Sequence, residues 1–286
     1  MPETVPPPDA SPGDTGLFGP GSVTWRIMGE PVIWVAGFRA LYMQALHPRV
    51  MRGTWQNTSF ARPGEAWGRF VRTTEFVSVR TYGTMAQVER VSRRVRKIHA
   101  SLNGTDPDGT RFRLDEPELL LWVHCGEISS YADVAWRSGM GLTAADLDTF
   151  VSEQRRSAEV IGLDPGSVPA SAAELNAYYE EMRPALCACA EAKQALWRSY
   201  NPDVPPPYLP LKLMVPPLNT LAFATLPRWA RRLYGTPGSP LTDLGATVAL
   251  RMARQSTTHI PRQLIYLPAA RAARRRQRER QRRPAA

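Results

Sequence analysis

Apolar side chains recur every three or four residues along most of the chain, which is the period at which an α-helix presents one face. Prolines, glycines and capping residues divide this pattern into segments. The helices predicted in this way span about residues 31–46, 64–82, 84–102, 115–137 and 241–255, and others open at Thr143, at Ser171 and near Pro227. No stretch alternates convincingly with a period of two, as a strand would. The sequence therefore predicts an all-α fold.

Two proline-rich segments interrupt this pattern. Residues 1–20 hold six prolines, and we predict a disordered leader there. Seven prolines lie between Asn201 and Pro217, where we predict an extended segment that wraps the body. Because no internal repeat is visible, residues 21–268 are predicted to form one globular helical domain.

The net charge of +10 is concentrated at one end of the chain. Residues 271–283 hold eight arginines and one glutamate, a net charge of +7, which leaves +3 for the rest. We predict an arginine-rich tail over residues 269–286 that stays solvated, so that its removal leaves the fold intact. Such tails also bind anionic lipid or acidic partners, so peripheral membrane contact through the tail stays open. No specific nucleic-acid partner is expected, because the body is nearly neutral and carries no recognised nucleic-acid motif.

The remaining compositional features favour a cytoplasmic protein. Cys125, Cys187 and Cys189 form neither a disulfide framework nor a metal knuckle. The first residues lack the basic start and apolar run of a signal peptide. No uninterrupted apolar stretch reaches the roughly 18 to 20 residues of a membrane span. We expect a cytoplasmic chain that is at most attached to a membrane surface.

The sequence lacks the short motifs of several enzyme classes. It has no His-Glu-x-x-His pair, no Cys-x-x-Cys pair, no Gly-x-Ser-x-Gly elbow and no phosphate-binding or dinucleotide-binding glycine loop. Zinc hydrolases, serine hydrolases and nucleotide-binding enzymes are therefore disfavoured. The candidates that remain are four histidines and a group of arginines.

His99 stands out because of its place in the predicted helix over 84–102. The apolar positions of that helix recur on one face, and they are Met85, Val88, Val91, Val95, Ile98 and Leu102. His99 shares this face, so it is expected to point inward. A buried imidazole stays neutral, and a neutral imidazole nitrogen binds iron or zinc. Spacing alone leaves open a core histidine that bonds a carbonyl.

Arg69, Arg72 and Thr73 share one face of the preceding predicted helix, because they are three and four residues apart. A guanidinium beside a hydroxyl suits a carboxylate or a propionate, since arginine presents a planar fork of donors. An exposed arginine pair beside a threonine bonded within its own helix is the alternative.

These segments, with others, resemble a known family. In chain order the matching motifs are Met43-Gln44-Ala45-Leu46-His47-Pro48, Arg69-x-x-Arg72-Thr73, Tyr82-Gly83, Lys97-Ile98-His99-Ala100-Ser101-Leu102-Asn103-Gly104 and Leu121-Trp122-Val123-His124. Over about residues 20–255 the chain resembles the catalytic domain shared by bacterial rubber oxygenases (latex-clearing proteins) and the fungal membrane-bound oxygenase of mycophenolic acid biosynthesis.

The resemblance implies a helical fold with a globin-like core around haem b. His99 matches the histidine that binds the iron, and Arg69 and Thr73 match the arginine and threonine of the family's Arg-x-x-Lys-Thr motif. Arg72 stands where rubber oxygenases have a lysine that can cap the distal side of the iron. Arginine is a poor iron ligand because it does not lose its proton. This departure implies an open or water-filled sixth position and disfavours rubber cleavage.

The function expected from the resemblance is a haem-dependent oxygenase in which Arg69, Arg72 and Thr73 support chemistry on an apolar organic substrate. Dioxygen or peroxide would be the second reactant, and the cofactor would carry the demanding step. A non-catalytic haem or lipid carrier, attached to membranes by its basic tail, is the alternative. His47 and His124 are placed as structural residues, with a position near the pocket left open for His124. The substrate and the electron donor are not encoded in any recognisable motif.

Overall fold

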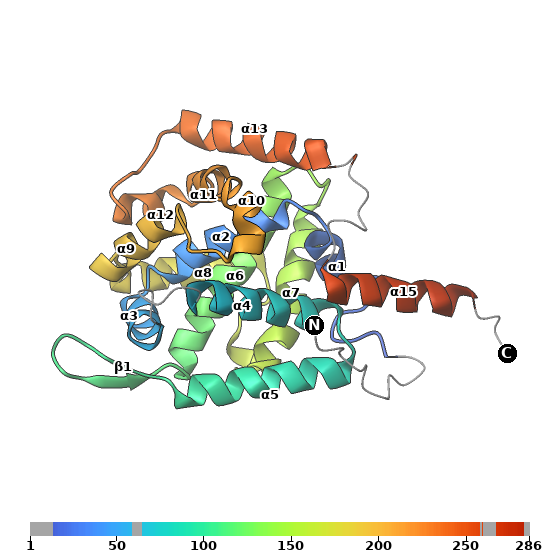
Figure 1. The fold of residues 1–286 in the computed structure, drawn as a ribbon, viewed down its shortest axis with the longest axis horizontal. Helices are drawn as coiled ribbons and strands as arrows, with labels where there is room; N and C mark the ends of the chain where they lie inside the picture. The colour runs from blue at the N-terminus through green and yellow to red at the C-terminus, as the bar shows by residue number, and fades with distance from the viewer. Residues whose placement is uncertain (1–13, 59–64, 258, 260–266, 283–286) are drawn as a thin grey trace.

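Helices account for most of the residues that the computed structural model describes, which are 14–58, 65–257, 259 and 267–282 (Figure 1). The first half holds α1 (Val23–Met28), α2 (Ile33–Gln44), α3 (Pro48–Asn57), α4 (Glu65–Tyr82), α5 (Met85–Ser101), α6 (Pro117–Arg137) and α7 (Ala144–Val160). The second half holds α8 (Ala172–Met182), α9 (Ala190–Ser199), α10 (Leu209–Lys212), α11 (Val215–Ala224), α12 (Arg228–Leu233), α13 (Pro240–Thr257) and α15 (Pro268–Arg282). Short 3₁₀ turns lie at Pro165–Ser167, Arg183–Ala185 and Pro206–Tyr208. The all-α prediction is confirmed, and so is the single globular domain.

A two-stranded hairpin joins α5 to α6, and helical periodicity did not predict it. Strands β1 (Asn103–Thr105) and β2 (Arg111–Arg113) pair antiparallel, with Gly104 opposite Phe112. A Cβ atom on Gly104 would lie 2.1 Å from the Phe112 ring, so the ring needs a glycine beneath it. The strands are too short to show a period of two.

The proline-rich segment is more helical than predicted. Residues 209–212 and 215–224 form α10 and α11, where an extended segment was expected. Pro216 and Pro217 stand in the first turn of α11, where backbone N–H groups need no partner within the helix and proline is tolerated. The prediction of an extended segment over residues 201–217 is therefore wrong for residues 209–212 and 215–217.

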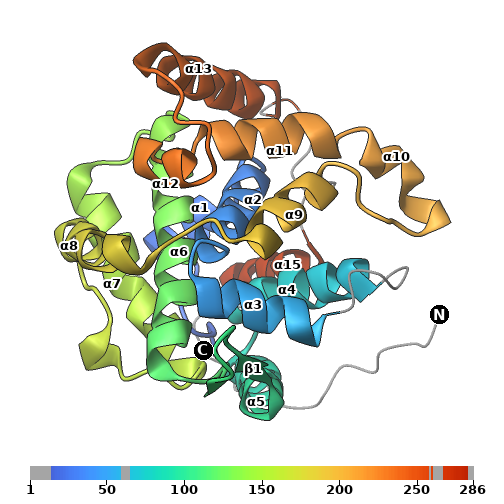
Figure 2. The same ribbon diagram turned by 90° about the vertical axis from the view of Figure 1, so that its left-hand side faces the viewer.

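The core is centred on α6, which lies against α2 through the middle of the molecule (Figure 2). Trp122 is fully buried, and its indole N–H donates to the carbonyl of Gln44 over 3.0 Å. The Gln44 side chain donates in turn to the carbonyl of Val123 over 2.9 Å. A Cβ on Gly126 would lie 3.0 Å from the Gln44 side chain, so glycine permits this close approach. The contact fixes α2 against α6.

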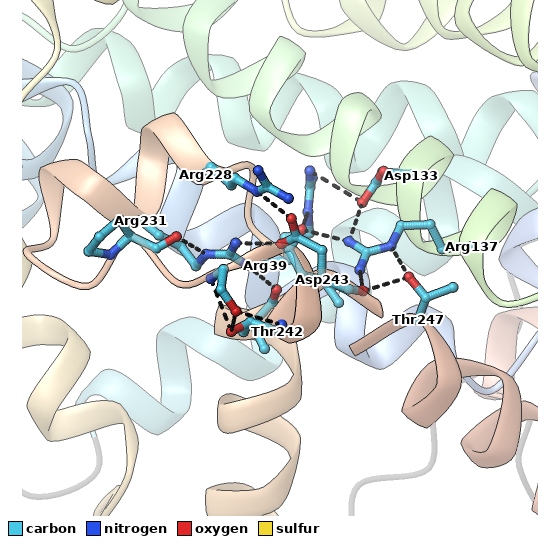
Figure 3. Close-up of polar contacts among 12 residues, drawn as sticks. Arg39, Asp133, Arg137, Arg228, Arg231, Thr242, Asp243 and Thr247 are labelled. Carbon is cyan, nitrogen blue, oxygen red and sulfur yellow. Dashed lines mark hydrogen bonds and ion pairs between the residues drawn. The ribbon is translucent and has the colours of Figure 1, made fainter. Parts of the chain in front are cut away.

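A network of arginines closes the C-terminal end of α11 (Figure 3). The carbonyl of Thr225 accepts from Arg39 Nε over 3.3 Å and from Arg137 Nη1 over 3.1 Å, and the carbonyl of Ala224 accepts from Arg231. These carbonyls carry the partial negative charge of a helix end, so cations stabilise them. The arginines come from α2, α6 and α12, and the network therefore ties three helices to the end of a fourth.

Two aspartates balance part of this charge. Asp133 on α6 is 3.5 Å from Arg39 and 3.4 Å from Arg137. Asp243 on α13 pairs with Arg228 and with Arg231, whose side chain is almost completely buried. Burial lowers the pKa of Arg39. The network joins α13 to the body by ion pairs.

Both ends of the described chain contact α4. Residues 1–13 of the predicted leader lie outside the described residues, whereas residues 14–20 lie against the body. Asp14 accepts from the backbone N–H of Met85 over 2.9 Å, and Phe18 packs in a small apolar cluster with Trp25 and Tyr82. These contacts join residues that are far apart in the sequence, so the proline-rich composition of residues 1–20 could not predict them.

The arginine-rich tail forms α15 and packs on α4, so the expectation of a solvated tail needs correction. Ala270 and Ala273 are buried in the cluster that contains Trp25 and Tyr82. Small side chains let the helix approach closely, while Arg271, Arg275 and Arg278 are exposed. Arg276 donates to the carbonyl of Tyr82 over 2.7 Å, which caps the last turn of α4.

Deleting residues 268–286 should therefore destabilise the protein, because it uncovers Trp25 and Tyr82 and leaves the Tyr82 carbonyl without this donor. We expect a loss of about 2 kcal/mol, the order of one buried apolar group plus one hydrogen bond. The thermal unfolding temperature should fall by several degrees. A shorter deletion, of residues 283–286, is the control and should leave it unchanged. If the full chain and the longer deletion unfolded at the same temperature, the original prediction of a solvated tail would be correct.

Candidate functional site

The helices α4 and α5 form a hairpin that carries the candidate residues. At its turn a Cβ on Gly83 would lie 2.5 Å from the carbonyl of Val79, so the chain turns there only with glycine. Thr84 then caps α5: its hydroxyl accepts from Gln87 N over 3.3 Å, and its own N–H donates to the Gln87 side chain over 3.0 Å. This reciprocal capping fixes where α5 begins and hence where His99 lies.

His99 lies in the last turn of α5, with its Nδ1 atom buried and without a hydrogen-bond partner in the described part of the chain. Burial lowers the pKa of His99, and the charge of Arg69 lowers it further, while Asp115 acts in the opposite direction. The imidazole is therefore neutral at pH 7 and keeps a lone pair. The alternative of a core histidine bonded to a carbonyl finds no support at Nδ1.

The apolar face of α5 that includes His99 is less buried than the spacing of its apolar residues predicted. Val88 is fully buried, but Met85 and Ile98 are exposed. Helical spacing tells which side chains share a face, and only a partner element decides whether that face is covered. Ile98 leaves accessible apolar surface directly beside His99.

Arg69 lies on α4 and is positioned by α3. Its guanidinium donates to the hydroxyl of Thr58 over 2.7 Å and to that of Thr54 over 3.3 Å. Desolvation by the surrounding chain lowers the pKa of Arg69, with Arg72 as the second cause, but by its accessible surface the residue is exposed. No carboxylate pairs with Arg69 within residues 14–58, 65–257 and 267–282. An unneutralised guanidinium held by two hydroxyls can bind an anion.

Arg72 and Thr73 make fewer contacts with the other candidate residues than Arg69 does. Both side chains are exposed, and the Arg72 guanidinium lies 3.2 Å from the Cβ position of Gly68, along its own helix. The charge of Arg72 acts on Arg69, which places the two guanidiniums near each other. For Thr73 no hydrogen bond to the other candidates is seen among the described residues. The structure thus brings Arg69 into electrostatic reach of His99 and of Arg72, and leaves Thr73 as a neighbour on α4.

Sequence reasoning missed two groups of residues that bear on this site. Thr54 and Thr58 position Arg69, but nothing in their sequence context distinguishes them from surface threonines. Ser92 is fully buried, and its hydroxyl has no partner in the described chain. It precedes His99 by seven residues, two helical turns on the same face, and this spacing was the available signal.

His124 is a second buried imidazole, on α6. It is almost fully buried, and neither ring nitrogen has a hydrogen-bond partner within the described residues. Burial lowers the pKa of His124 to about 4, with Arg80 lowering it and Glu127 raising it. Arg80 and Glu127 form an ion pair between α4 and α6 beside it. His124 is therefore neutral and lies beside the ion pair that joins α4 to α6.

His47 has a structural role, as the sequence indicated. It caps the N-terminus of α3, where its Nδ1 atom accepts from Val50 N over 3.5 Å. Its Nε2 atom lies 3.7 Å from a carboxylate oxygen of Glu118. Both ring nitrogens are thus engaged.

The donor set around His99 fits a cofactor that brings most of its own ligands. Among the described residues no group of three or more histidines, cysteines, aspartates or glutamates is arranged to hold a metal ion. A porphyrin supplies four nitrogens and needs one neutral imidazole and cations for its propionates. His99 is such an imidazole, and Arg69 is such a cation.

Two surface hollows lie elsewhere and are not part of this site. The larger, of about 760 Å³, runs along α7 and is lined by side chains such as Asp148, Glu153 and Arg155. The smaller, of about 270 Å³, lies beside α8. The larger hollow is lined by both acidic and basic side chains and the smaller by two glutamates, and neither is lined by a candidate residue.

Comparison with known proteins agrees with the motifs. No curated protein and no solved structure matches the chain. A protein-family model does match, over residues 25–256, and its description is "ER-bound oxygenase mpaB/B'/Rubber oxygenase, catalytic domain". The match covers most of the chain and includes every candidate residue. The resemblance is thereby confirmed, and the chain belongs to this oxygenase family, of which it carries the catalytic domain.

Proposed function

We propose that the protein is a haem b-dependent oxygenase that acts on an apolar organic substrate with dioxygen or peroxide. The observation that carries the proposal is the neutral His99 imidazole, which shares its surroundings with an unneutralised arginine in a chain of an oxygenase family. When bound, the haem would supply redox chemistry at its iron. His99 would hold the iron.

The other residues have roles that follow from their chemistry. Arg69, fixed by Thr54 and Thr58, would bind a propionate or another carboxylate. Arg72 stays protonated, so it can only donate hydrogen bonds, and it would orient an oxygen-bearing group. The Thr73 hydroxyl can donate and accept, and would relay a proton or position the substrate on the same face of α4.

Aromatic side chains near the start of α4 favour an apolar substrate. The Trp67 ring lies 5.7 Å from Phe70 and 5.1 Å from Tyr208, which stands just before α10. Phe70 extends the series to Phe38 on α2, over 5.8 Å. This aromatic wall would exclude water from an apolar molecule.

An absorption spectrum tests the proposal directly. Protein purified after expression with a haem supply should show a Soret band, and oxidation of apolar test substrates should follow addition of dioxygen with a reductant, or of peroxide. Protein that takes up no haem would refute the proposal. Haem binding without turnover of any tested substrate would favour the non-catalytic carrier.

Replacing Arg69 by alanine should weaken haem retention or activity by about tenfold or more, because a charge-assisted hydrogen bond of about 1.5–3 kcal/mol is lost. Thr73→Ala should lower activity more than haem retention. The measurements are Soret titration, turnover and circular dichroism. Arg94→Ala, which removes an exposed arginine from α5, is the matched control and should change nothing. Normal spectra and turnover in both site variants would return Arg69 and Thr73 to ordinary helix residues.

A further inference from the structure

The helix α13 is attached to the body through polar groups. Arg137 on α6 donates to the carbonyl of Asp243 over 2.9 Å and to the hydroxyl of Thr247 over 3.0 Å. Near the other end, Arg254 donates to the carbonyl of Gly139 over 2.9 Å. Ala246 and Leu250 are the fully buried apolar side chains of this helix. Its inner face is thus held mainly by ions and hydrogen bonds.

The large apolar side chains of α13 lie on its outer face. Leu241 is 75% exposed, Leu244 61% and Met252 64%, and Val248 lies between them on the same stripe. Surface helices normally turn such a stripe toward the core. Here the stripe faces solvent along an outermost helix (Figure 1). This orientation is explained if the stripe has a partner outside the chain.

The apolar face continues beyond α13. The views place α13, α11 and α10 in succession along one edge of the molecule, and α11 contacts both of the others (Figure 2). At the α10 end Leu213 is 81% exposed, and Leu209 and Met214 are exposed beside it. We call these side chains, together with the α13 stripe, the α10–α13 face.

The charge of this part of the chain selects the partner. Residues 209–257, from the start of α10 to the end of α13, hold six lysines and arginines and one acidic residue, Asp243. Asp243 is itself paired with Arg228 and Arg231. A second copy of the chain would bring cations against cations across a two-fold interface, which is unfavourable. An anionic partner with an apolar interior complements both properties.

We propose that the α10–α13 face docks on an anionic lipid surface, with its leucines and methionines inserted among the acyl chains and its cations near the headgroups. This is the arrangement of helices that lie in the plane of a membrane interface. No helix in the described part of the chain is long and apolar enough to cross a membrane, so the contact is peripheral. The proposal moves the membrane contact from the arginine tail, which packs on α4, to the α10–α13 face.

Vesicle co-sedimentation of the full-length protein tests this. The protein should bind phosphatidylcholine vesicles that contain phosphatidylglycerol, and bind vesicles of phosphatidylcholine alone much more weakly. The double variants L244S/M252S and L213S/M214S should each lower the partition coefficient on the order of tenfold, since two apolar side chains lose their insertion. High salt should weaken binding of all forms.

Met85→Ser is the matched control, because it removes an exposed apolar side chain from α5 at the far end of the molecule (Figure 1). It should bind like the unmodified protein, and all variants should keep their circular dichroism and unfolding temperature because the changed side chains are exposed. The proposal would be overturned if the protein did not bind anionic vesicles, or if both double variants bound them as strongly as the unmodified protein does. A dimer, seen by analytical ultracentrifugation, that the double variants convert to monomer would also overturn it. None of these measurements depends on haem or turnover.

Discussion

The His99→Ala variant should lose most of its haem, with a Soret absorbance per protein reduced to a small fraction and an affinity weaker by at least 10- to 100-fold. That range is typical of losing a residue that only supports a metal ligand, so it is a lower bound for the ligand itself. The fold should persist, because His99 is only partly buried and its Nδ1 atom bonds nothing in the described chain. Soret titration with circular dichroism as a fold check decides the matter.

His47→Ala is the control for this experiment, since His47 caps α3 and is engaged at both nitrogens. It should lower stability modestly and leave haem binding intact. The pH dependence gives a second reading. Metal binding needs the neutral imidazole, and the pKa of His99 lies below the ordinary histidine value, so haem loading should persist into mildly acidic solution. If the His99→Ala variant bound as much haem as the unmodified protein, His99 would not be the iron ligand.

The Asp243→Ala variant should unfold more easily by about 2 kcal/mol, less than for a fully buried ion pair because the Asp243 side chain is 33% exposed. Arg231 is 1% exposed, and its pairing with Asp243 is the charge interaction that offsets its burial. The side chain of Asp243 also binds Arg228, so the variant leaves two arginines and the end of α11 without this carboxylate. Urea denaturation, followed by circular dichroism, measures the difference.

Glu279→Ala is the matched control, because it deletes an ion pair with Arg275 that is exposed on both sides. Exposed pairs contribute about 0–1 kcal/mol, so this variant should be close to neutral. Replacing Asp243 and Arg231 together by apolar residues should recover part of the lost stability, since no unpaired charge remains. Equal stabilities of D243A and E279A would show that the network contributes nothing beyond surface pairing.

Acid should act on the same network. Hydrogen bonds from Arg231 and Arg228 outweigh burial and lower the pKa of Asp243 below its unfolded value. The stabilisation is therefore complete above the unfolded pKa and is lost as the pH falls through the folded one. The D243A difference should shrink in strong acid.

The helices were predictable because their evidence is local. The capping box at Thr84, the glycine turn at Gly83 and the apolar period of α5 all lie within a few residues of the elements they specify. The inward side of His99 followed from the same period. What the period could not predict was the exposure of Met85 and Ile98, because coverage depends on distant elements.

Long-range contacts explain the remaining differences. Arg39, Arg137 and Arg231 meet at the end of α11 although about a hundred residues separate each from the next, and no motif marks them. The tail was predicted to be solvated from its arginine content, whereas its docking depends on the small side chains Ala270 and Ala273. Amino-acid composition is an average over all sides of a helix, so the many arginines hid the two alanines on the side that makes the contact.

The docking of α15 also bears on how the protein is made. The α4 helix, which carries Arg69, is capped at Tyr82 by Arg276, 194 residues further along the chain. During translation, the ribosome therefore adds all the candidate site residues long before it adds α15, the helix that covers α4. A premature stop codon after Leu267 would spare every one of those residues, yet the truncated product would leave the ribosome with the apolar cluster at Tyr82 uncovered.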